Sequence, residues 1–351
     1  MTGDEELEIV RTKVCVILGA GASADASNEG GPPANPTWKP PLASELFGRR
    51  MVFQSGAARP YPGVRALASE LGELGPLPLE AKLLEFARDP RDLVRRYFRQ
   101  VPLYLRDLLL SVTTNYTGGE NPGNHVRLCL NLLKEHQTAF LDLNYDDYLE
   151  KALPVCGDGL EIRNLSDYVE LERVAIVGKV HGSIHWGTPV GPADAPSAHL
   201  EAYYAFDPLG PCPELIFAPS RDSTFGWRDR NGRLLYPVLT APLAGKDHTA
   251  LVCPKGHLDA LKTFLEGCTH YVVIGTSGLD DDLLGFLRQY VHSVELVHYV
   301  NKGETATESC KTNFEKAAPA FRNARRSIAF DGGFRLYLGS QHFRDFLQDS
   351  A

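Results

Sequence analysis

Apolar residues in this chain form two kinds of pattern, which alternate along much of its length. Short apolar runs rich in β-branched residues predict buried strands, at residues 13–18, 138–144, 172–182, 270–275 and 294–301. Stretches such as 258–268 and 281–291 repeat apolar residues about every 3.6 positions, which predicts amphipathic helices. Strands that alternate with helices favour parallel pairing and right-handed crossovers. We therefore predict an α/β fold, a Rossmann-like parallel sheet with helices on both faces.

Two stretches depart from this alternation. Residues 42–137 have helical spacing throughout and are too long for a simple crossover, so we interpret them as an inserted helical subdomain. Residues 187–250 are rich in proline, glycine and aromatic residues with little periodicity, which predicts an irregular small lobe. We expect residues 1–351 to form a single domain that carries both of these segments.

Net charge and cysteine spacing bear on the partners, metal sites and cellular location that this chain can have. The net charge of −8 disfavours a general electrostatic grip on nucleic acid, so we expect no direct nucleic-acid partner. The seven cysteines are scattered without a CxxC pair, so we expect no metal site and a reducing, cytoplasmic location. The acidic N-terminus does not resemble a signal peptide, and no apolar run reaches about 18 residues. We therefore expect no association with a membrane.

Small and polar residues follow the ends of four predicted strands. The segments are GAGAS (19–23), LNYDD (143–147), KVHGS (179–183) and GTS (275–277). The carboxyl ends of parallel strands gather at one edge of a sheet, and ligands bind there. Gly19 and Gly21 allow a tight turn and a close approach to a pyrophosphate, which the N-terminus of the next helix favours. All four segments could therefore face a single nucleotide.

Each segment also has a purely structural interpretation. GAGAS is not a full GxGxxG, since Ala24 stands at the third glycine, and it can be a tight turn without a ligand. Asp146 or Asp147 can cap the helix that follows. His181 can belong to a packed turn, and Asn301 can start an ordinary turn. GTS can be a capping turn, since Asp280 to Asp282 would open the next helix favourably against its dipole. The shared position of the segments at strand ends, rather than any one of them, indicates a binding site.

Taken in order, GAGAS, LNYDD, KVHGS, GTS and the strand ending in VN resemble the NAD-binding core of sirtuin-like proteins. Sirtuins carry a GAG-x-S loop, an Asn-x-Asp segment, a His-Gly segment, a GTS loop and a strand ending in Asn, in this order. The resemblance covers islands between residue 13 and about residue 302, and neither the helical stretch nor residues 187–250 take part in it.

The departures from the sirtuin pattern point to one branch of the family. Leu143 stands where deacylating sirtuins have Gln, and Asn-Glu-Gly-Gly-Pro-Pro replaces their Gly-Ile-Pro-x-Phe-Arg segment. Only three unpaired cysteines occupy the interval of their four zinc ligands: Cys212, Cys253 and Cys268. These features resemble the zinc-free bacterial branch, whose members degrade NAD in antiphage defence, as in Thoeris-type systems or with short Argonautes or HerA-type ATPases.

The resemblance implies a role for each matched residue. The pyrophosphate would be held by Gly19, Ala20, Gly21 and Ser23. Asn144 would orient a water or the nicotinamide ribose, Asp146 would bind the nicotinamide carboxamide, and His181 would be the general base. The second loop would contact the cofactor through Gly275, Thr276 and Ser277, with Ser277 on a phosphate. Asn301 would bind the adenine-side ribose.

The implied activity is that of an NAD+ hydrolase, which cleaves the nicotinamide–ribose bond to give ADP-ribose and nicotinamide, with NAD as substrate and without a metal. The alternatives are a non-enzymatic NAD- or ADP-ribose-binding regulatory subunit, an NAD-dependent protein deacylase and a Rossmann dehydrogenase. The incomplete GxGxxG disfavours the dehydrogenase. Because uncontrolled NAD hydrolysis would be toxic, we expect control by homo-oligomerisation or by a separately encoded HerA-type ATPase or short-Argonaute partner. Residues 42–136 are the expected contact surface.

Overall fold

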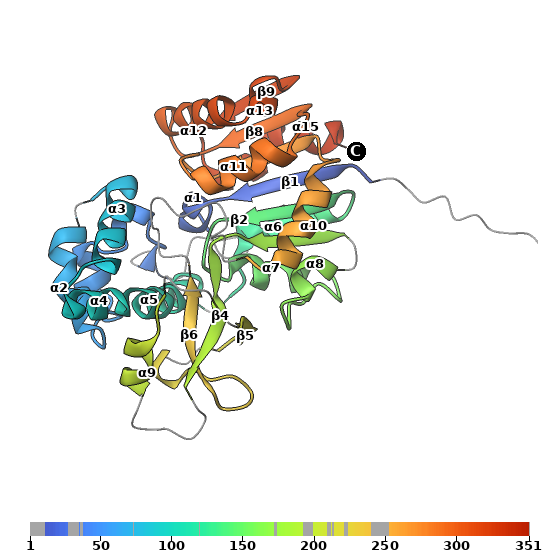
Figure 1. Ribbon diagram of the computed structural model, residues 1–351. Helices are drawn as coiled ribbons and strands as arrows, with labels where there is room; N and C mark the ends of the chain where they lie inside the picture. The colour runs from blue at the N-terminus through green and yellow to red at the C-terminus, as the bar shows by residue number, and fades with distance from the viewer. Residues whose placement is uncertain are drawn as a thin grey trace, which may run out of the picture.

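A parallel sheet forms the centre of the molecule (Figure 1). The computed structural model describes residues 11–26, 35, 38–72, 74–118, 120–171, 174–191, 199–208, 212, 214–220, 224–239 and 253–350. Within these residues the sheet has six strands: β1 (Lys13–Leu18), β2 (Gln137–Asp142), β3 (Ala175–Lys179), β7 (His270–Ile274), β8 (Leu296–Val300) and β9 (Arg326–Phe330). Their spatial order is β3-β2-β1-β7-β8-β9, and every neighbouring pair is parallel.

Counted by themselves, these strands run in the order 3-2-1-4-5-6, which is that of the doubly wound Rossmann fold. The predicted fold class is therefore confirmed. The order reverses between β1 and β7, and a crevice at such a reversal is the usual ligand position in open α/β sheets. The sequence pattern did not predict β9, which lies at the sheet edge and carries several partly exposed residues.

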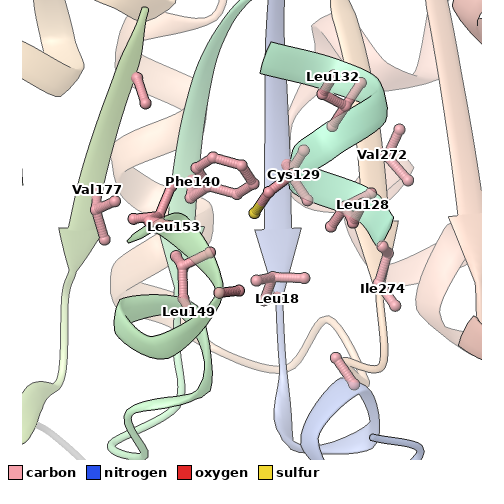
Figure 2. Packing of buried hydrophobic residues seen from close by; sticks show 14 of the residues in the cluster. Leu18, Leu128, Cys129, Leu132, Phe140, Leu149, Leu153, Val177, Val272 and Ile274 are labelled. Atoms are coloured by element: carbon pink, nitrogen blue, oxygen red, sulfur yellow. The ribbon is translucent and has the colours of Figure 1, made fainter. Parts of the chain in front are cut away.

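Two layers of helices cover the sheet, because its strands are apolar on both faces. Val14, Val16 and Leu18 pack into one core, and the intervening Cys15 and Ile17 pack into the other. The first layer contains α6 (Gly123–Leu133), α7 (Tyr148–Cys156), α8 (Asp167–Glu170), α14 (Phe334–Gly339) and α15 (Gln341–Asp349). The second contains α10 (Lys255–Leu265), α11 (Asp281–Tyr290), α12 (Glu304–Ala317) and α13 (Pro319–Arg322). Figure 2 shows α6 and α7 packed over β1, β2 and β3 in the first core.

The stretch between β1 and β2 is helical, as its spacing predicts. After the short α1 (Ala20–Ala24), it contains η2 (Ala43–Glu45), η3 (Arg50–Gln54), α2 (Pro62–Leu71), α3 (Pro76–Ala87), α4 (Asp92–Phe98) and α5 (Gln100–Thr117). Side chains of η3 and α2–α5 form a third core, separate from the two cores of the parallel sheet. The last helix of the stretch, α6, packs on the parallel sheet instead.

The region expected to be an irregular lobe contains regular structure. In the described residues, β4 (Gly182–Gly191), β5 (Ile216–Phe217) and β6 (Leu234–Leu239) form an antiparallel sheet in the order β5-β4-β6, with α9 (His199–Ala205) and η4 (Thr224–Gly226) beside it. Residues 192–198, 209–211, 213, 221–223 and 240–250 of the region lie outside the described residues. Leu234 and Tyr236 pack into the core of the helical stretch, which joins the two regions.

Arg106 on α5 links the helical stretch to this small sheet. It is fully buried, and its guanidinium donates hydrogen bonds to the backbone oxygens of Ile184 (2.9 Å) and Ser220 (3.1 Å). The same group lies 3.8 Å from the ring centroid of Trp227, a cation–π contact. Among the described residues, no helix is both long enough and apolar enough to cross a membrane.

Acid is expected to destabilise the fold through His125, which lies on α6 against the rings of Tyr148 and Phe334. Burial, together with the nearby charge of Lys179, lowers the pKa of His125 from 6.5 to about 3. A depressed pKa means that the neutral ring contributes stability above the unfolded pKa, and that this stability is lost as the pH falls toward the folded value. Urea unfolding measured between about pH 7 and about pH 4 should depend less on pH in His125→Phe than in the wild type. Equal slopes would contradict the prediction.

Candidate functional site

Two glycine loops interlock where the strand order reverses. The loop after β1 donates from Gly19 N to Ile274 O (2.9 Å) and from Gly21 N to Gly275 O (2.8 Å). A Cβ atom at Gly19 would lie 2.7 Å from Gly275 O, and one at Gly21 would lie 2.7 Å from Gly275 Cα. The glycines that the sequence assigns to a pyrophosphate thus also allow close contact between these two loops. The helix α1 has only five residues, and Gly21 N and Ala22 N are already hydrogen-bonded within the chain. The loop therefore offers a phosphate fewer free backbone N–H donors than the N-terminus of a long helix would.

Asn144 lies beside the first glycine loop. Its side-chain amide donates to Gly19 O at 3.1 Å, and its backbone N donates to the Asp142 carboxylate at 3.0 Å. The side chain is buried at the carboxyl end of β2. This amide therefore fixes the end of β2 against the loop that follows β1, at the sheet edge where a ligand is expected.

Asp146 and Ser23, both predicted to contact NAD, bind each other. The Ser23 hydroxyl donates to Asp146 Oδ2 at 2.6 Å, and the other carboxyl oxygen accepts from Tyr148 N at 3.2 Å. Burial raises the pKa of Asp146, although Lys179 and the donors from Ser23 and Tyr148 act in the opposite direction. The pair joins the first loop to the start of α7. Ala20, in the same loop, is partly exposed.

Lys179, at the end of β3, is the centre of a buried ionic network. Its ammonium donates to Asp142 Oδ2 (2.9 Å) and to Asp146 O (2.5 Å) and lies 3.4 Å from Glu150 Oε2. Burial alone would lower the pKa of Lys179, but the neighbouring carboxylates outweigh it and raise that pKa. Sequence reasoning gave Lys179 no role. The available signal was a lysine at the end of an otherwise apolar strand.

His181 follows β3 and pairs with Asp280, which precedes α11. His181 Nε2 hydrogen-bonds to Asp280 Oδ2, and the Tyr145 ring lies 6.4 Å from the His181 ring, centroid to centroid. Burial opposes ionisation of Asp280, but the hydrogen bond from His181 and the backbone donors outweigh it and lower the pKa of Asp280. Burial and the charge of Asp280 raise the pKa of Glu80 on α3, and the charge of His181 lowers it.

The GTS loop is held by asparagine side chains. Asn301, at the end of β8, donates to Thr276 O at 3.0 Å, and Asn313 on α12 donates to Ser277 O at 2.9 Å. Thr276 is buried, and its hydroxyl accepts from Gly278 N, whereas Ser277 is exposed. The amide of Asn301, predicted to bind a ribose, thus supports the loop that was predicted to bind phosphate.

The predicted residues therefore gather at the carboxyl ends of β1, β2, β3, β7 and β8. Gly19, Asn144 and Gly275 are joined through the two loops, and Ser23 binds Asp146. Their assignment to NAD remains a prediction. Sequence reasoning treated Asp280 only as a helix-capping residue and did not single out Glu80. Among the described residues, no three His, Cys, Asp or Glu side chains form a group that could hold a metal.

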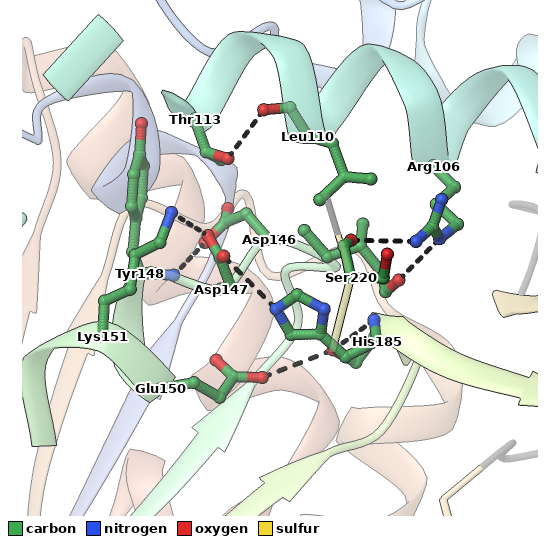
Figure 3. Close-up of polar contacts among 12 residues, drawn as sticks. Arg106, Leu110, Thr113, Asp146, Asp147, Tyr148, Glu150, Lys151, His185 and Ser220 are labelled. Carbon is green, nitrogen blue, oxygen red and sulfur yellow. Dashed lines mark hydrogen bonds and ion pairs between the residues drawn. The ribbon is translucent and has the colours of Figure 1, made fainter. Parts of the chain in front are cut away.

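A cavity of about 480 Å³ is lined in part by Asp147 of the LNYDD segment and by Glu150, Lys151 and His185. Asp147 in its wall lies 3.3 Å from His185 Nε2 and 2.8 Å from Lys151 Nζ (Figure 3). Burial opposes ionisation of Asp147, but the hydrogen bond from His185 and the charge of Lys151 outweigh it and lower its pKa. The two consecutive carboxylates thus lie in different environments: Asp146 binds Ser23 of the glycine loop, and Asp147 lines this cavity.

Comparison with known proteins gives only distant similarity. No protein-family model matches the chain, and no curated protein sequence matches it. Among solved structures, it is similar to a Sir2 enzyme studied for mechanism and regulation, with 13% identity over 97% of this chain and 92% of the other and a TM-score of 0.41. It is also similar to Sir2 bound to the inhibitor EX-527, 2′-O-acetyl-ADP-ribose and a deacetylated p53 peptide, with 12% identity over 97% and 94% and a TM-score of 0.39. Similarity at this level does not assign a family.

Proposed function

We propose that this protein is an NAD+ hydrolase that cleaves the nicotinamide–ribose bond. The main support is a single arrangement: the Asn144 amide, the His181–Asp280 pair and two glycine loops all lie at the edge where the strand order 3-2-1-4-5-6 reverses. In such sheets a dinucleotide binds with its pyrophosphate at the first glycine loop. The order of motifs, which resembles that of sirtuin-like proteins, supports the same ligand.

The reaction needs few groups. The bond between ribose C1′ and the nicotinamide nitrogen breaks, and its electron pair neutralises the cationic ring, so the leaving group needs no proton. A water oxygen bonds to C1′, and His181 takes the proton that this water releases, directly or through a ribose hydroxyl, and passes it to solvent. The Asn144 amide would position the water or the ribose without adding charge. Positioning and electrostatics would supply most of the reduction in the barrier.

Control of the activity follows from its chemistry. An NAD hydrolase that is always active would deplete the cell of NAD, so we propose regulation by self-assembly or by a separately encoded partner such as a HerA-type ATPase or a short Argonaute. The resemblance to zinc-free bacterial sirtuin-like proteins supports a role as an antiphage defence effector. The helical stretch, in which the charge of Glu80 on α3 interacts with that of Asp280, is the proposed route by which a partner acts on the site.

Loss of the proposed base or of the Asn144 amide is expected to abolish the reaction. We expect His181→Ala and Asn144→Ala to reduce nicotinamide release from NAD by about 10²-fold or more, because a positioned base or a positioned polar group contributes at least that much. Release is measured by chromatography with the purified full chain, alone and with proteins encoded beside it. His292→Ala, at an exposed histidine outside the site, is the matched control.

The regulatory-subunit and deacylase alternatives each have their own outcome in this assay. Cleavage that is intact in both variants would overturn the proposed function. Tight NAD binding without turnover under every condition would favour a regulatory subunit. Nicotinamide release that depends on an acylated peptide would favour a deacylase.

A further inference from the structure

Asp280 makes two contacts that differ in purpose. One carboxylate oxygen, Oδ1, accepts from Leu283 N at 2.8 Å and caps the N-terminus of α11. The other, Oδ2, accepts from Nε2 of His181, which lies 99 residues away in the sequence. The first contact is an ordinary capping interaction. It does not require the second, which fixes a histidine from another strand end.

The surroundings keep this carboxylate charged. The hydrogen bonds from His181 and the backbone outweigh burial and lower the pKa of Asp280, so its oxygen acts as an acceptor toward the ring. An ionised acceptor at Nε2 selects the tautomer with hydrogen on Nε2, and the acid–base role then belongs to Nδ1. Both side chains retain some exposure, 17% for His181 and 21% for Asp280, so protons can exchange with solvent.

We propose that Asp280 is a positioning residue for His181: it accepts the Nε2–H, fixes the ring and its tautomer, and leaves Nδ1 to take the proton from water or a ribose hydroxyl. This proposal rests on the proposed function. When Nδ1 gains the proton, the ring becomes an imidazolium whose charge the Asp280 carboxylate stabilises, and the carboxylate itself remains ionised. The proton then leaves Nδ1 for solvent, which restores the neutral ring.

Other titratable groups face the pair from three elements. Asp281 and Asp282 share the first turn of α11 with the capping Asp280, Glu80 comes from α3, and the phenol of Tyr145 follows β2. All except the phenol are carboxyl groups. Asp280 is the group that hydrogen-bonds to Nε2, so its replacement should change both the tautomer and the rate.

The test keeps the capping contact of Asp280 and removes its charged contact with His181. Asn and Ser both cap helices about as well as Asp, so Asp280→Asn and Asp280→Ser should keep α11 and the thermal stability while removing the charge. For nicotinamide release, we expect kcat to fall by about 10²- to 10⁴-fold in Asp280→Asn with NAD affinity nearly unchanged. The acid limb of the pH–rate profile should move to lower pH, because the variant no longer stabilises the imidazolium.

A second readout does not depend on catalysis. Long-range ¹H–¹⁵N NMR of the ligand-free protein, with the signals assigned through His181→Ala, reports which nitrogen of His181 carries hydrogen. We expect the Nε2–H tautomer in the wild type and its loss in Asp280→Asn. An Nδ1–H ring in the wild type, or kcat and acid limb unchanged in Asp280→Asn, would overturn the proposal. If the wild type releases no nicotinamide, the proposed function fails, and the NMR result alone decides whether Asp280 sets the tautomer.

Discussion

Replacing Lys179 with methionine is expected to lower the free energy of unfolding by about 3–5 kcal/mol, the usual cost of removing one partner from a buried ion pair. The Lys179 side chain is fully buried, and the carboxylates of Asp142 and Glu150 are both nearly so. Methionine matches the unbranched apolar stem of lysine but lacks the ammonium, and so leaves those carboxylates without a cation. The loss would also release the Asp146 backbone oxygen, which the ammonium now holds at 2.5 Å.

The pH dependence of this loss distinguishes it from a packing defect. Burial already raises the pKa of Asp142, and removal of the lysine would raise it further. A carboxyl group with a raised pKa contributes stability at low pH that is lost as the pH rises through the folded value. The destabilisation of Lys179→Met should therefore be smaller at about pH 5 than at about pH 8.

Urea unfolding of Lys179→Met and of Lys134→Met, at an exposed lysine beyond α6, measures the effect. The control should stay within about 0.5 kcal/mol of the wild type. A loss in Lys179→Met below about 1 kcal/mol, or one independent of pH, would mean that the network does not hold the ends of β2 and β3 together.

Much of the parallel sheet could be predicted because its strands are buried on both faces. The run 13–18 is uniformly apolar, and the structure divides it between two cores, with Val14 on one side and Cys15 on the other. A run of this kind can be recognised as a strand in the sequence, whichever strands pair with it. By contrast, β9 is partly exposed and contains Arg326, which pairs with Asp349, so its composition does not resemble that of a buried strand.

The small antiparallel sheet was missed for a different reason. β4 contains four glycine and proline positions, residues that ordinarily indicate turns. At Gly187 the strand needs a glycine because the chain packs closely there: a Cβ would lie 2.8 Å from the Trp227 ring. That contact joins segments 40 residues apart and leaves no periodic signal in the sequence.

The candidate site could also be predicted only in part, because some of its features have a local sequence signal and others depend on distant contacts. The sequence identified which strand ends carry polar residues, because position after an apolar run is a local signal. It did not show that Ser23 binds Asp146 or that His181 binds Asp280, since these pairs join positions 123 and 99 residues apart. The capping role inferred for the Asp280–Asp282 segment is confirmed at Asp280, but the second contact of Asp280 could not be predicted from spacing.

Gly275→Ala is expected to destabilise the protein by about 2–5 kcal/mol, through two additive effects. Gly275 has a φ of +69°, in the left-handed region, which costs a residue with a Cβ about 1–2 kcal/mol. Its Cβ would also lie 2.2 Å from Ala22 N and 2.5 Å from the carbonyl carbon of Gly21. The glycine loops would have to separate, at a steric cost of about 1–3 kcal/mol.

Gly56→Ala isolates the first effect. Gly56 has a similar φ of +79°, but no atom lies within 4 Å of its added Cβ, so only the backbone cost of about 1–2 kcal/mol applies. Urea unfolding of both variants gives the steric cost as their difference, and NAD binding by calorimetry should weaken only in Gly275→Ala. Equal destabilisation of the two variants would contradict the close packing of the loops. A large difference with unchanged NAD affinity would instead assign the glycines to the contact between the loops and remove them from the proposed pyrophosphate site.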